Sequence, residues 1–189
     1  MYSNTGTDNI EDFGLISLMY HRFEENKYPS TNIKISDFKK HLEIIQKNNI
    51  KFINPKNFEE EIKVNKKQRK ILLTIDDGFL SFYENAWPIL KEKKIPFILF
   101  VSTREVGSFN YMNWDQIKKI SEEDFVEIGN HSHSHEYLVD ESNEIIIADI
   151  LKSINIFKSK LGKNSDFFSY PFGEYSTNFK NIIKSLGFK

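Results

Sequence analysis

The chain has 189 residues, with 26 Lys and Arg against 27 Asp and Glu, which leaves a formal net charge of −1. A near-neutral chain lacks the overall positive field of a nucleic-acid-binding protein, so no nucleic-acid partner is expected. The absence of cysteine excludes disulfides, cysteine-ligated zinc, iron–sulfur clusters and a cysteine nucleophile. The apolar runs are all shorter than the roughly 20 residues of a membrane-spanning helix, so we expect no transmembrane segment.

Residues 1–13 are polar and acidic and are predicted to form a flexible lead-in. They lack the apolar stretch of a signal peptide. On the sequence alone the chain is expected in the cytoplasm. If it is a trimmed piece of a longer protein, the cell envelope or the extracellular space is expected instead.

Apolar runs alternate with amphipathic helical patterns along the rest of the chain. Strands are predicted at residues 15–20, 52–53, 71–75, 96–102, 125–128 and 167–170, the first of them buried. Helices are predicted at residues 36–49, 57–62, 79–93, 114–120, 145–161 and 178–186, with Pro88 as an anomaly in the third. Residues 63–70, a basic run, are predicted to be a solvated connection rather than a phosphate-binding patch.

This order of strands and helices indicates an α/β fold with a parallel sheet covered by helices. In such folds, binding and catalytic residues gather at the carboxyl ends of the strands. Three polar segments of this chain follow predicted strands and are therefore candidates for one common site.

Two adjacent carboxylates, Asp76 and Asp77, follow the strand at residues 71–75 in the segment TIDDG. They arrive at the strand end facing different directions, so one can bind a metal while the other acts as a base. Gly78 allows the backbone to turn sharply. Asp-Asp-Gly is also an ordinary turn sequence, and the motif alone leaves both interpretations open.

Three of the five histidines lie in the segment HSHSH, residues 131–135. His131 and His135 are four residues apart and share one face of either a helix or an extended strand. His133 shares that face only if the segment is extended. Neutral imidazoles at this spacing suit a divalent metal, although surface histidines also chelate metals adventitiously.

The third segment is SYPFG, residues 169–173, where Pro171 and Gly173 predict a rigid turn that presents the backbone N–H of Phe172. By itself it reads equally well as a loop turn without chemistry. Together, one carboxylate and two histidines form a three-ligand metal set with an open position. A second carboxylate can deprotonate water there, and a backbone N–H can hold an oxyanion. The combination predicts metal-assisted hydrolysis of an amide or an ester.

In their order, these segments resemble the NodB-type polysaccharide deacetylases, carbohydrate esterase family 4: TIDDG, IPFILFVST, NWDQI, EIGNHSHSH and SYPFGEYS. The opening LMYHRF resembles the subgroup that acts on poly-N-acetylglucosamine and related exopolysaccharides. The resemblance covers residues 15–188. It implies a distorted (β/α) barrel with about seven strands when complete, and removal of N-acetyl groups from an acetylated polysaccharide or oligosaccharide.

The resemblance also implies a role for each site residue. Asp76 would be the general base, and Asp77, His131 and His135 the ligands of one divalent metal, with zinc expected and cobalt or nickel as alternatives. The backbone N–H of Phe172 would stabilise the oxyanion. Tyr170 and Pro171 would bind substrate at the cleft floor. Apart from the resemblance, the aromatic ring of Trp114 could stack on a sugar ring, although packing in the core is the simpler expectation.

Two departures from the family pattern are visible. Ser169 occupies the place where many members have the arginine that holds the catalytic base. The general-acid histidine of the family, expected after residue 186, is not in the chain, and the other histidines, His21 and His41, do not match that motif. His21 follows the first predicted strand and could lie near the cleft, but a core or surface position is favoured; His41 is expected on the surface of a helix. The domain at residues 14–189 is therefore expected to lack its C-terminal part, to have an open barrel edge, and to turn over poorly.

Three other functions stay open at this point. The missing acid and Ser169 are compatible with a non-catalytic carbohydrate-binding protein on the same fold, although an intact Asp76 argues against it. An O-acetyl esterase, or an amidohydrolase acting on a small molecule, would use nearly the same metal chemistry.

Overall fold

The computed structural model describes residues 14–63 and 68–189, so the predicted lead-in at residues 1–13 lies outside the described residues. The strands are β1 (Leu15–Tyr20), β2 (Arg22–Phe23), β3 (Asn32–Ile33), β4 (Lys51–Phe52), β5 (Lys70–Ile75), β6 (Phe97–Val101) and β7 (Val126–Asn130). The α-helices are α1 (Ile35–Lys47), α2 (Phe58–Lys63), α3 (Trp87–Lys93), α4 (Trp114–Ser121), α5 (Asn143–Leu161) and α6 (Thr177–Ser185).

The main sheet is parallel throughout and confirms the predicted α/β class. Its strands follow the order β1-β5-β6-β7, with β4 beside the first residues of β5. β2 and β3 form a separate two-stranded parallel sheet. Among the described residues β1 pairs with β5 alone, so the outer edge of β1 has no strand partner there.

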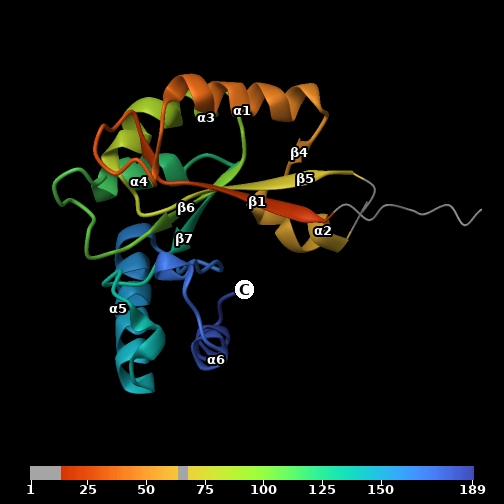
Figure 1. Ribbon diagram of the computed structural model, residues 1–189. Coiled ribbons are helices and arrows are strands. Elements are labelled where there is room, and N and C mark those ends of the chain that lie inside the picture. The colour runs from red at the N-terminus through yellow and green to blue at the C-terminus, as the bar shows by residue number, and fades with distance from the viewer. Residues whose placement is uncertain (1–13, 64–67) are drawn as a thin grey trace, which may run out of the picture.

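Figure 1 shows α1 and α3 above the main sheet in this view, and α5 and α6 below it. In α1, Phe38, Leu42 and Ile45 recur at helical spacing and are buried. They join the main core with outward-facing side chains of β5 and β6 such as Leu73 and Leu99. In the described parts of the chain, each helix is too short or too polar to span a membrane.

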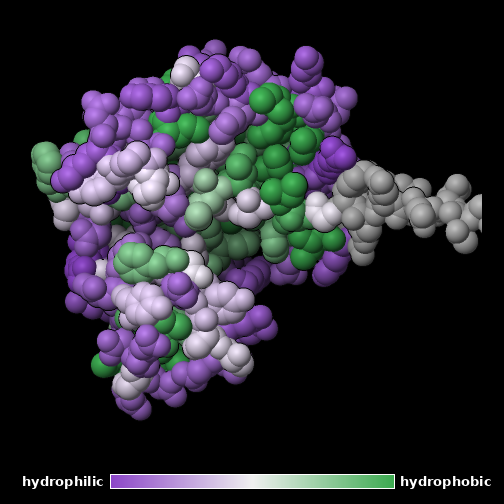
Figure 2. All heavy atoms as spheres, viewed as in Figure 1, coloured by the Kyte–Doolittle hydropathy of each residue, from purple (hydrophilic) through white to green (hydrophobic). Residues whose placement is uncertain are grey.

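The other face of the sheet is open and forms a cleft of about 760 Å³. Because side chains alternate along a strand, the residues between those of the main core face this cleft. They include Ser17 and Met19 of β1, Leu72 and Thr74 of β5, and Ile98 and Phe100 of β6. Figure 2 shows hydrophobic residues gathered on this side of the molecule over β1 and β5. The cleft runs along the carboxyl ends of the strands, where the predicted site residues lie.

Two strand predictions need correction. Residues 167–170 form no strand; only Phe168 makes a parallel bridge, with Asn130 of β7. The chain leaves β7 there because Pro171 has no N–H to donate and the next residues turn. β1 is a strand as predicted but is not buried, since Ile16 and Met19 are 59% and 55% exposed.

Two further differences concern residues 63–93. Lys70 of the predicted solvated run begins β5 and is only 5% exposed, and its ammonium group lies 3.2 Å from Glu61 Oε2. Residues 80–93 are helical without a break, as predicted, but Phe82–Ala86 form a π-helical turn within them. Pro88 follows that turn and lies in the first turn of α3.

Candidate metal centre and active site

The two carboxylates at the end of β5 point in different directions. Asp76 continues the alternation of Leu72 and Thr74 and faces the cleft, and its backbone N–H donates to the carbonyl oxygen of Tyr20 at 2.9 Å. Asp77 has a left-handed backbone, with φ of 74°, which turns its side chain toward the loop after β7. The two neighbours thus occupy different places in one site, as predicted.

His131 and His135 meet the carboxylate of Asp77. Oδ1 of Asp77 lies 3.2 Å from Nε2 of His131 and 3.0 Å from Nε2 of His135. One ligand atom from each residue falls within 4.8 Å of the others. One carboxylate and two imidazoles form a three-ligand set of the kind that leaves a coordination position for water or substrate.

The hydrogen bonds around the three ligands fit a cation. His131 Nδ1 lies 2.8 Å from the carbonyl oxygen of Ser169, which only accepts, so Nδ1 carries the proton and Nε2 of the neutral ring presents a lone pair. That lone pair faces Asp77 Oδ1, which is buried and receives no hydrogen bond from the described residues. Acceptors that converge without a donor are what a metal ion satisfies.

Electrostatics lead to the same conclusion. Burial would raise the pKa of Asp77, but the imidazoles of His131 and His135 beside it outweigh burial and hold that pKa well below its usual range. The carboxylate therefore stays ionised and needs positive charge close by. A divalent cation can supply that charge at the same three atoms.

Asp76 has the surroundings of a buried base. Its side chain is 3% exposed, and Ser169 Oγ donates to its Oδ2 at 3.0 Å. Its Oδ1 receives no hydrogen bond within residues 14–63 and 68–189. Burial raises the pKa of Asp76 above its usual range, against the opposing influence of His131, His21 and the Ser169 hydrogen bond. Ser169 therefore contacts the carboxylate that the family's arginine was expected to hold.

His133 is directed away from the three ligands. Its Nδ1 is 2.9 Å from Thr103 Oγ1, and its backbone N–H donates to Asp149 Oδ1 at 2.8 Å. The segment 131–135 is not extended, because Ser132 and His135 have φ of 67° and 53°. The alternative that the sequence left open, a ligand role for His133, is thereby excluded.

The turn at Pro171–Gly173 closes one side of the site. Phe172 has a φ of 60°, and its ring lies 4.8 Å from that of His135. The N–H groups of Gly173 and Glu174 donate to the carbonyl oxygens of Tyr170 and Pro171. Among the described residues the Phe172 N–H has no backbone acceptor. Phe172 itself lines the cleft.

Comparisons with known proteins agree with this geometry. The sequence pattern of the family described as "Polysaccharide deacetylase" matches residues 63–189, which is more than half of the chain. The chain belongs to the polysaccharide deacetylase family. The match includes all of the residues above that form the candidate metal centre.

Curated relatives of this member of the polysaccharide deacetylase family include the poly-β-1,6-N-acetyl-D-glucosamine N-deacetylases of two staphylococci. The Staphylococcus aureus protein is 27% identical over 93% of this chain, and the Staphylococcus epidermidis protein is 28% identical over 95%. The chain spans 65% of the length of each of these relatives.

Solved structures share the fold. IcaB from Ammonifex degensii matches with a TM-score of 0.85 and 27% identity, over 93% of this chain and 82% of the other. The deacetylase PplD from Streptococcus pyogenes, solved with acetate, matches with a TM-score of 0.80 and 22% identity, over 93% and 80% of the two chains. The second likeness concerns the fold alone.

One cleft residue received no role from sequence reasoning, which favoured a core or surface position for it over one near the cleft. His21 lines the cleft together with Asp76, and its charge acts on that carboxylate. The sequence contained the signal, because Ser17, Met19 and His21 alternate along β1 and its extension, so that all three share one face. The interpretation of residues 15–20 as a fully buried strand hid this alternation.

Three predicted substrate contacts have different outcomes. Tyr170 lines the cleft as expected. Pro171 is buried inside the turn and does not line the cleft, so it acts only by setting the path of its neighbours. Trp114 is placed elsewhere: its ring packs edge-on against Phe157, with centroids 6.1 Å apart, in the main core. We therefore do not assign a sugar contact to Trp114.

Proposed function

We propose that the chain is the catalytic domain, at residues 14–189, of a metal-dependent hydrolase that removes N-acetyl groups from a polysaccharide containing N-acetylhexosamine. The observation that carries this proposal is the convergence of Asp77, His131 and His135 beside a separate buried carboxylate, Asp76. A binding protein has little use for an uncommitted carboxylate next to a metal set. A hydrolase needs it as a base.

Zinc is the metal we infer, because two imidazoles and one carboxylate suit it, and cobalt or nickel would fit the same atoms. When bound, the metal supplies Lewis acidity, which polarises the acetyl carbonyl and makes water more acidic. The ligand geometry is held by the chain itself, since Ser169 fixes the His131 ring through Nδ1.

The protein residues then have three tasks. Asp76 removes a proton from the attacking water, and its raised pKa brings it closer to neutral pH than an ordinary aspartate. The Phe172 N–H donates to the oxyanion that develops on the acetyl carbonyl. Ser169 orients the Asp76 carboxylate through its hydrogen bond.

We infer that His21 protonates the departing sugar amine. It lines the same cleft as Asp76, and among the described histidines of the cleft it is the one outside the metal set. The expectation of poor turnover rested on the lack of a general acid after residue 186. A histidine supplied by the first strand would remove that reason.

The inferred substrate is a β-1,6-linked poly-N-acetylglucosamine or a related polymer. The names of the staphylococcal relatives and the similarity to IcaB support it. The cleft is long and mostly apolar along its floor, with Tyr170, Phe172 and Tyr175 at one side. Aromatic rings of this kind suit the apolar faces of sugar rings.

The test measures acetate release from N-acetylglucosamine oligosaccharides by the zinc-loaded chain. Asp76→Asn should lower the rate by about 10²–10⁴-fold, as loss of general base catalysis does, while zinc affinity is retained. Asp77→Asn should lower both the rate and the zinc affinity. Asp140→Asn is the matched control, since Asp140 is exposed in the segment between His135 and α5.

Full activity of Asp76→Asn would overturn the proposal. Release of acetate from O-acetylated but not from N-acetylated oligosaccharides would assign an esterase instead. Oligosaccharide binding by zinc-loaded protein without any acetate release would favour the carbohydrate-binding alternative.

The role of His21 has its own test. His21→Gln should slow hydrolysis of N-acetyl oligosaccharides strongly, because an amine leaves poorly without a proton. It should barely affect hydrolysis of an aryl acetate whose phenolate leaves unprotonated. Asp140→Asn, exposed and outside the cleft lining, is again the control. Equal losses on both substrates would show that His21 is not the acid.

A further inference from the structure

The loop that carries the two histidine ligands has an unfavourable backbone. Ser132 and His135 have φ of 67° and 53°, in the left-handed region that costs a non-glycine residue free energy. The loop keeps this conformation while it holds the Nε2 atoms of His131 and His135 within 3.2 Å of Asp77 Oδ1. Some group outside the metal set must stabilise it.

Side-chain oxygens bind the backbone N–H groups of this loop in succession. The donor–acceptor pairs are Ser132 N with Asn130 Oδ1 at 2.9 Å, His133 N with Asp149 Oδ1 at 2.8 Å, Ser134 N with Asp149 Oδ2 at 3.0 Å, and His135 N with Ser132 Oγ at 2.9 Å. Two of these four acceptor atoms, on Asn130 and Ser132, lie within the loop or next to it. The other two belong to Asp149, which comes from α5.

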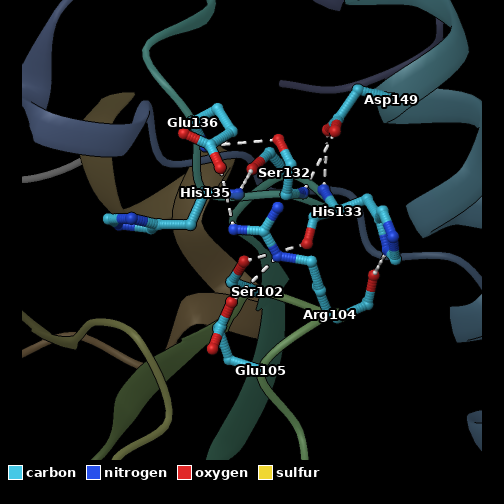
Figure 3. Close-up of polar contacts among 10 residues, drawn as sticks. Ser102, Arg104, Glu105, Ser132, His133, His135, Glu136 and Asp149 are labelled. Atoms are coloured by element: carbon cyan, nitrogen blue, oxygen red, sulfur yellow. Dashed lines mark hydrogen bonds and ion pairs between the residues drawn. The ribbon is translucent and has the colours of Figure 1, made fainter.

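Asp149 uses both carboxylate oxygens on two consecutive amides. Figure 3 shows it reaching down to the loop backbone, while the His135 side chain extends to the other side. Hydrogen bonds that a carboxylate accepts are charge-assisted and stronger than neutral ones. The two amides lie midway between the ligands, so their position determines the separation and tilt of the two rings.

The carboxylate itself is held on a rigid support. Ile146 and Ile150, on either side of Asp149 along α5, are fully buried in the core between α5 and α6. On the opposite side of the loop, Ser102 Oγ and the Arg104 N–H donate to the His133 carbonyl oxygen at 3.2 and 2.9 Å. The centre of the loop is thus clamped between α5 and the residues that follow β6.

We propose that Asp149 is a positioning residue, whose carboxylate holds the loop so that His131 and His135 are preorganised for the metal. The effect on metal binding rests on the proposed metal-dependent function. The effect of Asp149 on the loop conformation does not. A side chain that merely stabilised α5 would affect unfolding without changing the geometry of the metal set. Asp149, in contrast, acts on the ligands through the backbone of the segment between them.

The experiment compares the full chain with Asp149→Asn, Asp149→Ala and the control Asp140→Asn. Asparagine keeps the shape of the side chain but presents one acceptor and one donor group, so one of the two amides loses its partner. Three quantities are measured: zinc affinity by chelator competition, the visible spectrum of the cobalt-loaded protein, and hydrogen exchange of the His133 and Ser134 amides in metal-free protein. Circular dichroism confirms that each variant is folded.

We expect Asp149→Ala to weaken zinc binding by about 10–100-fold, as loss of outer hydrogen bonds to metal ligands does. Asp149→Asn should weaken it less, and both should alter the cobalt spectrum. Exchange of the two amides should become about tenfold faster or more in Asp149→Ala, because their acceptor is gone. Asp140→Asn should change none of these quantities.

Unchanged amide exchange and unchanged zinc affinity in folded Asp149→Ala would overturn the inference. A lower unfolding temperature with wild-type affinity and spectrum would also overturn it, because Asp149 would then serve stability alone. Failure of the wild-type chain to bind any metal would contradict the proposed function. Amide exchange in the metal-free protein would still decide whether Asp149 holds the loop.

Discussion

Gly129 of β7 is a position where one added methyl group has a predictable cost. It lies directly opposite Phe100 of β6, whose ring covers it. A Cβ at Gly129 would be 2.2 and 2.3 Å from two ring carbons of Phe100 and 2.9 Å from Cγ2 of Ile98. Since carbon atoms pack at about 3.5–4.0 Å, the ring must move by about 1 Å or more.

The free-energy change follows from two opposing effects. Phe100 and Ile98 are 7% and 1% exposed, so the extra methyl overpacks a closed region, at a cost of about 1–3 kcal/mol. Replacing glycine inside a strand returns about 0.5–1 kcal/mol of backbone entropy. Gly129→Ala should therefore lower the free energy of unfolding by about 1–2 kcal/mol.

Urea unfolding of four proteins measures this as a double-mutant cycle: wild type, Gly129→Ala, Phe100→Ala and the double variant. Without the ring, only Cγ2 of Ile98 remains too close, so Gly129→Ala should cost clearly less in the Phe100→Ala background. Gly14→Ala is the control, because a Cβ there meets nothing within 4 Å. An equal loss in both backgrounds would refute the argument that the Phe100 ring is the obstacle.

Three further predictions concern the site and the core. Ser169→Ala removes a hydrogen bond to the Asp76 carboxylate, so the pKa of Asp76 should rise further. The acid limb of the pH–rate profile should then move to higher pH, and a profile superimposable on the wild type would contradict this. Chelation should lower the unfolding temperature and zinc should restore it, since ligand at 100 times its Kd stabilises by about 2.7 kcal/mol; unchanged melting would argue against the metal site. Leu73→Ala, in the fully buried part of β5, should cost about 2–5 kcal/mol in urea unfolding, whereas a loss below 1 kcal/mol would mean that the core tolerates the cavity.

Local signals were sufficient for most of the fold. The apolar run that became β5 is buried at every position, and the cap at Ser142 and the left-handed Gly162 mark the two ends of α5. Strand–helix alternation then implies a parallel sheet, which places TIDDG and HSHSH at one edge. The sequence could not show that residues 167–170 make a single bridge, because that depends on where β7 ends.

The residues missed at the site share a physical reason. His21 and Asp149 both act on partners that are distant in the sequence and that the fold brings close. His21 is 55 residues from Asp76. Asp149, on α5, is 16 and 15 residues from the amides of His133 and Ser134. His21 was recoverable from alternation along β1, given that this strand has one face in the cleft. Asp149 was not, because its partners are backbone amides, which every residue has.

Backbone strain at the site explains why the conformational propensities of single residues predict the local structure least well there. Asp77, Ser132, His135 and Phe172 all have φ between 53° and 74°, although none is glycine. Asp77 and Phe172 directly precede Gly78 and Gly173, which are also left-handed. From the sequence, only the glycines were predicted to turn the backbone. Each such residue costs about 1–3 kcal/mol unless its surroundings hold it. Hydrogen bonds from side chains meet that cost in the histidine loop, and they come from elements that local patterns cannot link to it. The part of the chain that departs most from its own conformational preferences is therefore the part that aims the metal ligands, as expected where function opposes local stability.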